Sequence, residues 1–169
     1  MKNKIILVCC FLISTISMNA QKFAYVDTDY ILSKIPEFSQ SEEQINKYSK
    51  QWNDEIAAGY KEIEQMFQDY QSEEILLDES LKIKRQESII EKEKYVHSLQ
   101  QKYFGSEGEL YKKRQELISP IQDRIFDAIQ QLAANNKYSI IFDASSDLIM
   151  LYSNPDLDKS DKILQIMGY

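Results

Sequence analysis

Side chains able to carry out chemistry are few in this chain, and their spacing builds no catalytic or metal site. His97 is the single histidine, and the two cysteines, Cys9 and Cys10, lie near the N-terminus. A zinc site needs several such ligands and an activated nucleophile needs a base beside it. We therefore expect His97 on a helix surface or seam, without a chemical role. The sequence also lacks a glycine-rich phosphate loop and a Gly-x-Ser-x-Gly motif.

Four aspartates are the remaining candidates, because paired carboxylates can act as general acid and general base. Asp27, Asp29, Asp143 and Asp147 all fall at predicted strand ends or turns. Aspartate at such positions commonly accepts hydrogen bonds from backbone N–H groups, and we predict capping and turn roles for all four. The chain is expected not to be an enzyme and to need no cofactor and no metal.

Residues 1–20 have the pattern of a secretory signal peptide. Lys2 and Lys4 precede an apolar core at residues 5–16, and small and polar residues lead to Ala20. That core of about 12 residues is shorter than the roughly 20 that a membrane-spanning helix needs. We predict cleavage after Ala20 and export of the mature chain. Both cysteines belong to the removed segment, so the mature chain is expected to have no disulfide.

The mature chain is acidic. Removing the two lysines of the signal leaves 18 basic against 27 acidic residues, a net charge of −9. Nucleic acids and anionic membrane surfaces bind clustered lysine and arginine, so neither nucleic acid nor strong membrane binding is expected. Only four glycines and three prolines occur, which favours a mostly helical chain. No segment after the signal is apolar for long enough to cross a membrane.

Residues 37–118 are rich in charge and carry apolar side chains every three or four positions, as an amphipathic helix does. The pattern breaks near residues 72–80. So long a helix cannot bury its stripe unless it folds back, so we predict an antiparallel hairpin with its tip at residues 74–78. The segment Asp78-Glu79-Ser80 is expected to provide the N-cap of the return limb. The stripe comprises Ile45, Tyr48, Trp52, Ile56, Tyr60, Ile63, Phe67 and Tyr70 on the outgoing limb, and Leu81, Ile90, Leu99, Tyr103, Leu110 and Leu117 on the return limb.

Charge differs between the two limbs. Residues 37–79 contain 12 acidic and 3 basic side chains, whereas residues 80–119 contain 6 acidic and 9 basic. Opposite signs favour antiparallel docking of the limbs within one chain. With the tip near residue 76, positions that sum to about 153 are expected to face each other. The predicted layers pair Ile63 with Ile90, Ile56 with Val96 or Leu99, and Trp52 with Leu99 or Tyr103.

Short elements precede the arm, and the arm itself has possible breaks. Residues 22–27 are predicted to form a strand, followed by a short helix that Thr28 or Asp29 caps and that ends at Pro36. A capping box at residues 39–44, based on Ser39 or Ser41, is expected to begin the outgoing limb. Gly105 and Gly108 mark the expected hinge of the return limb. Ser119-Pro120 either begins a new helix or kinks a continuous one.

Two further strands and a helix are predicted after the arm. Tyr138–Asp143 and Leu148–Tyr152 alternate or cluster β-branched and aromatic residues on either side of a short turn. Asp158 or Ser160 is expected to cap a last helix that ends at Met167. The expected organisation is a β/α body of residues 21–36 and 119–169, and a coiled-coil arm of residues 37–118.

This order of elements resembles the plan of the Skp/OmpH family of periplasmic chaperones. Residues 23–32 (FAYVDTDYIL) resemble the family's first strand and helix, and residues 116–121 (ELISPI) are similar to its Leu-Leu-x-Pro-Ile step. Residues 129–133 (IQQLA), followed by residues 138–144 (YSIIFDA), resemble its passage from helix to strand. The resemblance covers the whole mature chain.

The resemblance implies an α+β, mostly α fold in which long helical arms extend from a small β base. It also implies a homotrimer with an intersubunit β barrel, whose arms surround a cavity that holds unfolded outer-membrane proteins without ATP. The best-known member is basic, so the lipopolysaccharide site proposed with that charge is not expected in this acidic chain. The expected interface residues are Phe23, Tyr25, Val26, Ile140, Ile141, Phe142, Ile149 and Leu151.

The aromatic residues of the arm allow two interpretations. They can form the seam of the hairpin, or they can remain partly exposed and contact unfolded chains, because a two-helix arm cannot cover both sides of large rings. The candidate contact residues are Tyr48, Trp52, Tyr60, Phe67, Tyr70, Tyr95 and Tyr103. For the whole protein the corresponding hypotheses are a holdase chaperone, or a structural coiled-coil spacer or tether of the envelope.

Overall fold

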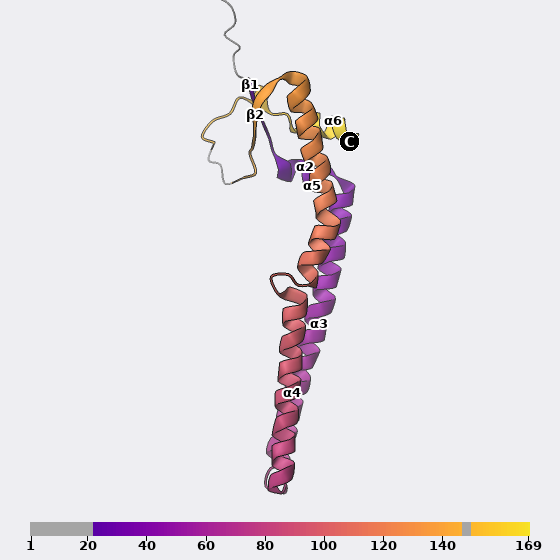
Figure 1. Cartoon of the computed structure of the whole chain (residues 1–169), viewed down its shortest axis with the longest axis vertical. Helices are drawn as coiled ribbons and strands as arrows, with labels where there is room; N and C mark the ends of the chain where they lie inside the picture. The colour runs from indigo at the N-terminus through magenta and orange to yellow at the C-terminus, as the bar shows by residue number, and fades with distance from the viewer. Residues whose placement is uncertain (1–21, 147–149) are drawn as a thin grey trace, which may run out of the picture. The chain divides into compact units, whose positions relative to one another are not determined.

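The computed structural model describes residues 22–146 and 150–169 (Figure 1). Two compact units make up the chain. The first contains the described residues up to Ile31 and from Asp127 onward, and the second is Leu32–Phe126. The predicted mostly helical α+β fold class is confirmed. The roles assigned to the two predicted domains, trimerisation by the body and an arm at residues 37–118, stay predictions.

The first unit is built on a two-stranded parallel sheet. Strand β1 (Lys22–Val26) pairs with strand β2 (Tyr138–Asp143), with Ala24 opposite Ile141. Successive side chains of a strand point to opposite faces. Ala24 and Val26 therefore share one face and are buried, whereas Phe23 points to the other face and is exposed. The other edge of β1 is occupied at Tyr25, whose carbonyl accepts a hydrogen bond from the backbone N–H of Lys159 at 2.9 Å.

The predicted strand at Leu148–Tyr152 is not formed in the part that the structure describes. Met150 to Tyr152 are irregular, and the Leu151 and Tyr152 side chains are almost fully exposed. Leu148, like Asp147 and Ile149, lies outside the described residues. A strand needs a neighbouring backbone to satisfy its N–H and C=O groups. The edge of β1 that does not pair with β2 forms a single bridge instead, between Tyr25 and Asp158.

Two helix starts in this unit differ from the prediction. Helix α2 (Thr28–Lys34) is capped by Asp27, whose Oδ1 accepts from the backbone N–H of Tyr30 at 2.9 Å, so Thr28 and Asp29 are not its caps. Helix α6 (Ser160–Met167) follows the 3-10 helix η1 (Pro155–Leu157) and has Lys159 at its N-cap position. Asp158 is not the N-cap residue, but it still contacts the start of α6, because its Oδ1 accepts a hydrogen bond from the backbone N–H of Ser160 at 2.9 Å.

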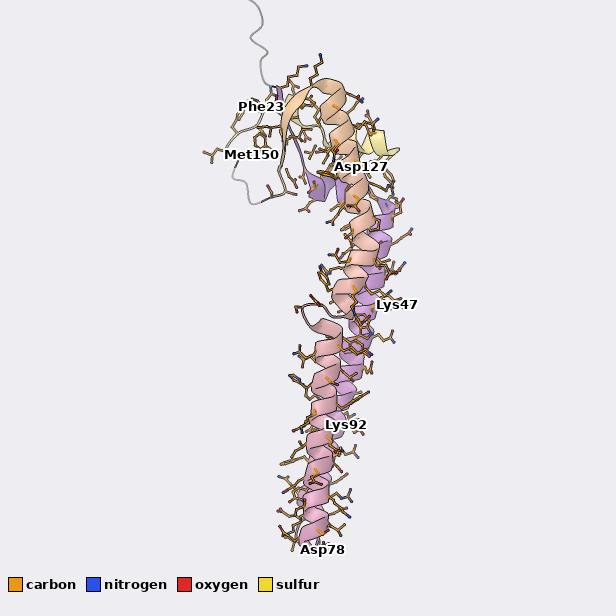
Figure 2. All side chains as sticks on the ribbon, viewed as in Figure 1. Phe23, Lys47, Asp78, Lys92, Asp127 and Met150 are labelled. Carbon is orange, nitrogen blue, oxygen red and sulfur yellow. The ribbon has the colours of Figure 1, made fainter. Side chains whose placement is uncertain are left out.

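The second unit contains a long helical hairpin. Helix α3 (Pro36–Glu73) has 38 residues and α4 (Glu79–Phe104) has 26, and the two lie side by side (Figure 1). At about 1.5 Å per residue, α3 is about 57 Å long. The tip at Glu74–Asp78 is confirmed, and Asp78 caps α4 by accepting from the N–H of Leu81 at 2.9 Å; it lies at the end of the hairpin in Figure 2.

The start of α3 differs from the predicted capping box, and the helix around Pro120 decides between the two alternatives for Ser119-Pro120. Pro36 is the first residue of α3, where its missing N–H costs nothing, and Ile35 at the N-cap makes no side-chain cap. The predicted capping box is therefore wrong; the Ser41 hydroxyl donates to the Glu37 carbonyl at 2.7 Å. Helix α5 (Glu109–Asn136) contains Pro120 in its interior, so Ser119-Pro120 does not begin a new helix.

The return limb is interrupted between α4 and α5, at the two glycines that the sequence singled out. The N–H of Gly105 still donates to the Gln101 carbonyl at 2.9 Å, which closes the last turn of α4. A Cβ added to Gly105 would lie 2.4 Å from that same carbonyl oxygen. Glycine is therefore sterically required at this helix end.

The hairpin seam confirms part of the predicted register. Ile56, Val96, Leu99 and Tyr103 form one buried cluster, against which Trp52 packs. The pairings of Ile56 with Val96 or Leu99, and of Trp52 with Tyr103, are thus confirmed.

Near the tip the register differs. Ile89 is 8% exposed and belongs to the seam, whereas Ile90 is 47% exposed, so the predicted Ile63–Ile90 layer is wrong. Tyr70 contacts Gln86 through its hydroxyl, where a sum of 153 would place residue 83 opposite it. Near the tip, the return limb is therefore offset by about three residues, slightly less than one helical turn, from the predicted register.

Candidate functional surface

Two of the aspartates considered for chemistry, Asp27 and Asp143, hold the backbone of the first unit by hydrogen bonds. Asp143 Oδ2 accepts from the Thr28 hydroxyl at 2.7 Å, and Oδ1 accepts from the N–H groups of Thr28 and Ser145 at 3.2 and 3.1 Å. Burial acts to raise the pKa of Asp143, but these hydrogen bonds outweigh it and hold the pKa below its ordinary value. The turn role of Asp143 and the capping role of Asp27 are confirmed. Asp29 is exposed in the first turn of α2.

His97 is exposed on α4, as expected for a surface histidine. Among residues 22–146 and 150–169, no group of His, Cys, Asp and Glu side chains is arranged to hold a metal ion. Within the same residues, none of the helices is apolar over enough of its length to cross a membrane.

Three of the seven candidate contact aromatics lie in the seam of the hairpin. Trp52 stacks on Tyr103 with ring centroids 4.9 Å apart and planes at 6°. The Tyr48 ring also stacks on Trp52, with centroids 5.6 Å apart. The Tyr103 hydroxyl donates to Glu55 Oε2 at 2.9 Å. Burial, followed by this carboxylate, raises the pKa of Tyr103. The Tyr103 ring and the half-buried Trp52 ring therefore hold the limbs together.

Tyr70 is the third seam aromatic. Its hydroxyl accepts from Gln86 Nε2 at 2.8 Å and donates to Glu74 Oε1 at 3.3 Å. Burial and the charge of Glu74 raise the pKa of Tyr70. With its ring buried and its hydroxyl engaged on both sides, Tyr70 offers little surface to another molecule.

The other four candidates, Tyr48, Tyr60, Phe67 and Tyr95, are exposed. The seam interpretation is therefore wrong for Tyr60 and Phe67. Their preceding neighbours are less exposed, because Gly59 is buried and Met66 is half-buried. The limbs approach so closely at Gly59 that a Cβ there would lie 2.6 Å from Val96 Cγ2.

Sequence reasoning missed Gly59, Ile89 and the exposed residue Ile83. The signal for Gly59 is its place three residues after Ile56 and four before Ile63, which continues the seam spacing. A glycine contributes no apolar side chain, so a search for apolar residues selects its neighbour Tyr60 instead.

Ion pairs connect the acidic outgoing limb with the basic return limb. Lys92 Nζ lies 2.5 Å from Glu62 Oε2, and Arg85 Nη2 lies 3.3 Å from Glu73 Oε2. Exposed pairs of this kind each contribute only about 0–1 kcal/mol. Their placement agrees with the antiparallel docking expected from the limb charges.

The expected interface residues of the first unit differ in exposure. Phe23, Ile140, Phe142 and Leu151 are exposed, whereas Val26 is fully buried within the chain. Tyr25 and Ile141 are half-buried, and Ile149 lies outside the described residues.

Part of this apolar surface is hollowed. A pocket of about 260 Å³ is lined by residues that include Phe23, Tyr25, Phe142, Met150 and Leu157. Phe23 and Met150 are labelled on this unit in Figure 2. The unit therefore has an apolar surface that its own described residues leave uncovered.

Comparison with known proteins agrees with this architecture. The model of the family "Outer membrane protein (OmpH-like)" matches residues 22–167. A crystal structure described as an outer membrane chaperone (OmpH-like) from Caulobacter crescentus CB15 superposes with a TM-score of 0.68 at 13% sequence identity. The similarity covers 88% of this chain and 85% of that one, and at this identity it establishes a shared fold. A search of curated protein sequences finds no match. Because the family model spans nearly the whole described chain, this protein belongs to the OmpH-like outer membrane protein family.

Proposed function

We propose that this protein is an ATP-independent holdase chaperone of the periplasm, which binds unfolded outer-membrane proteins after its signal peptide is cleaved behind Ala20. The observation that carries the proposal is the exposure of large apolar side chains along a hairpin without catalytic groups. Tyr60, Phe67 and Ile90 are each about half exposed. Exposed apolar surface of this kind marks interaction sites, and unfolded chains offer apolar side chains in return.

Membership of the OmpH-like family and the fold shared with the Caulobacter protein support a chaperone role. The exposed side chains belong to helices, whose backbone N–H and C=O groups are already paired, so contacts to a client would be made by side chains. Such contacts are weak and tolerate many client sequences. Release then needs no nucleotide, since a client that folds buries its own apolar groups.

The test is an aggregation assay with the mature protein, residues 21–169. A β-barrel outer-membrane protein unfolded in urea is diluted into buffer without ATP, and light scattering is followed with increasing amounts of the mature protein. We expect scattering to be suppressed at stoichiometric amounts. Undiminished scattering would contradict the holdase proposal and favour the alternative, a structural coiled-coil spacer or tether of the envelope.

We further propose that the protein assembles as a homotrimer through the first unit, whose strands would join an intersubunit barrel. A two-stranded sheet with an open edge is marginal alone, and strands from other copies would complete its pairing. The exposed Phe23, Ile140, Phe142 and Leu151 side chains support this proposal.

Light scattering coupled to size-exclusion chromatography tests the assembly. The wild type should have three times the mass of one mature chain, and Ile140→Asp should lower that mass because a charge would enter the interface. Tyr111→Asp, at an equally exposed position of α5 in the second unit, is the control and should leave the mass unchanged. A wild-type monomer at micromolar concentration would contradict the trimer.

A further inference from the structure

Four apolar side chains that do not belong to the seam lie along the hairpin at regular intervals. Tyr60 and Phe67 on α3 are 49% and 50% exposed, and Ile83 and Ile90 on α4 are 48% and 47% exposed. Each pair is separated by seven residues, which is 20° short of two helical turns and about 10.5 Å along the axis. The members of each pair therefore lie on the same side of their own helix.

Hydrogen bonds between the limbs show that both pairs lie on one side of the hairpin. The Tyr60 hydroxyl donates to Gln100 Oε1 at 3.4 Å, which joins the Tyr60 side of α3 to the Gln100 side of α4. Gln86, which contacts the Tyr70 hydroxyl, lies three residues after Ile83 and four before Ile90. Steps of 3, 4, 3, 4 and 3 then connect Ile83 with Gln100 along one stripe of α4. We call the surface formed by Tyr60, Phe67, Ile83 and Ile90 the lateral apolar face.

The opposite side of the hairpin is charged. There Glu55 accepts from the Tyr103 hydroxyl, and Glu62 pairs with Lys92. Seven-residue steps on α4 place Leu81, Tyr95 and Lys102 on this side, and Asp69 follows Glu62 on α3. Leu81 and Tyr95 are its exposed apolar residues, at 45% and 53%. The two sides thus differ chiefly in the number of exposed apolar side chains, four on the lateral apolar face and two on this side.

The charge of the lateral apolar face limits what it can bind. The charged side chains one helical turn from its apolar residues are four acidic and one basic: Glu64 on α3, and Glu79, Glu87, Glu93 and Lys94 on α4. Acidic segments would therefore be repelled, whereas apolar and basic segments would not. This composition favours unfolded stretches rich in aromatic, aliphatic and basic residues.

The area of the face argues against a second folded copy as its occupant. Four half-exposed side chains offer about 100 Å² each, or roughly 400 Å² in total. A stable interface between folded proteins buries about 800 Å² on each partner. A surface of half that size suits weak, repeated contacts with one flexible chain.

We infer that the lateral apolar face, and not the charged side, is the surface of the arm that holds unfolded client segments of apolar to basic composition. The inference rests on the proposed holdase function and assigns that function to one side of the hairpin.

Two matched double variants test the assignment in the full mature protein. Phe67→Ser with Ile90→Ser removes one ring and one aliphatic side chain from the lateral apolar face. Tyr95→Ser with Leu81→Ser removes the same kinds of group, equally exposed, from the charged side. Affinity for a urea-diluted, fluorescently labelled outer-membrane protein is measured for both, and circular dichroism confirms equal helix content. We expect at least a tenfold loss for the first variant and less than a twofold loss for the second.

Photo-crosslinking gives a readout that does not depend on folding of the double variants. Benzoylphenylalanine is placed singly at position 67 or 90, and at position 81 or 95, and crosslinks to the same client are compared. Crosslinks concentrated at 67 and 90 support the inference. Equal crosslinking on both sides, or equal affinity losses in the double variants, overturns it while the holdase proposal stands. A wild-type protein that binds no client and leaves aggregation unchanged overturns the proposed function, and the inference with it.

Discussion

Trp52 and Tyr103 stack across the hairpin with their ring planes 6° apart and their centroids separated by 4.9 Å. Tyr103 belongs to the last turn of α4, directly before the break at Gly105, while Trp52 lies within the uninterrupted α3. The stack therefore fixes the end of the interrupted limb to the continuous one.

Replacing Trp52 by alanine should destabilise the hairpin by about 2–3 kcal/mol, below the range for a fully buried tryptophan because this ring is half-buried. The free energy of unfolding in urea measures the effect. Tyr95→Ala, at an exposed position of α4, is the control and should cost less than about 0.5 kcal/mol. Equal losses in the two variants would mean that the stack does not secure the limb.

Gly59→Ala should push the limbs apart, because the added Cβ would lie 2.6 Å from Val96 Cγ2. Overpacking of this kind costs about 1–3 kcal/mol. Val96→Ala removes the opposing methyl groups, so the double variant should lose less stability than the sum of the single losses. Urea unfolding of all four proteins completes the cycle, and strictly additive losses would contradict the close approach.

Protonation of Asp143 should weaken the first unit. Its pKa is depressed in the folded chain, so its stabilising contribution is present above the ordinary pKa of about 3.9 and is lost as the pH falls through the folded value. Asp143→Asn keeps the shape but removes the charge. The difference in urea midpoint between the wild type and this variant should be largest near pH 7 and should shrink below about pH 4. A difference that is independent of pH would show that the charge is not what stabilises the turn.

Client binding should depend little on salt if apolar side chains do the holding. Screening shortens the Debye length from about 10 Å at 0.1 M to about 3 Å at 1 M, which weakens charge-driven association but leaves apolar contacts intact. Fluorescence titration of an unfolded outer-membrane protein at both salt concentrations should show less than a tenfold loss of affinity. A larger loss would assign the holding to the charged limbs rather than to Tyr60, Phe67 and their neighbours.

The sequence alone predicted the first strand, the helical hairpin, the strand at Tyr138–Asp143 and the last helix, but not the irregular Met150–Tyr152 segment. It also predicted several features that depend on local chemistry. The long amphipathic period predicted the hairpin, and the apolar gap at residues 72–80 predicted its tip. The N-cap was predicted within Asp78-Glu79-Ser80, and the Asp78 carboxylate provides it by satisfying an N–H group only three residues away. Gly105 and Gly108 likewise marked the interruption of the return limb. Such features are determined within one or two helical turns, so no distant residue is needed to predict them.

The tertiary structure decided which residues of the apolar stripe are buried. Gly59 rather than Tyr60, and Ile89 rather than Ile90, lie in the seam. Adjacent positions on a helix differ by about 100°, and an apolar stripe is at least that wide, so both members of such a pair fit the sequence pattern.

Only the approach of the partner helix decides which of two adjacent apolar-stripe positions is buried, because one position meets the opposite limb and the other remains in solvent. The parallel pairing of β1 with β2 is also decided by the tertiary structure, since it joins Ala24 to Ile141, which are separated in the sequence by the entire hairpin. Its formation depends on the return of the chain, which the local sequence of neither strand specifies. The side of the arm that exposes apolar groups, and with it the candidate surface, is therefore a property of the packed hairpin.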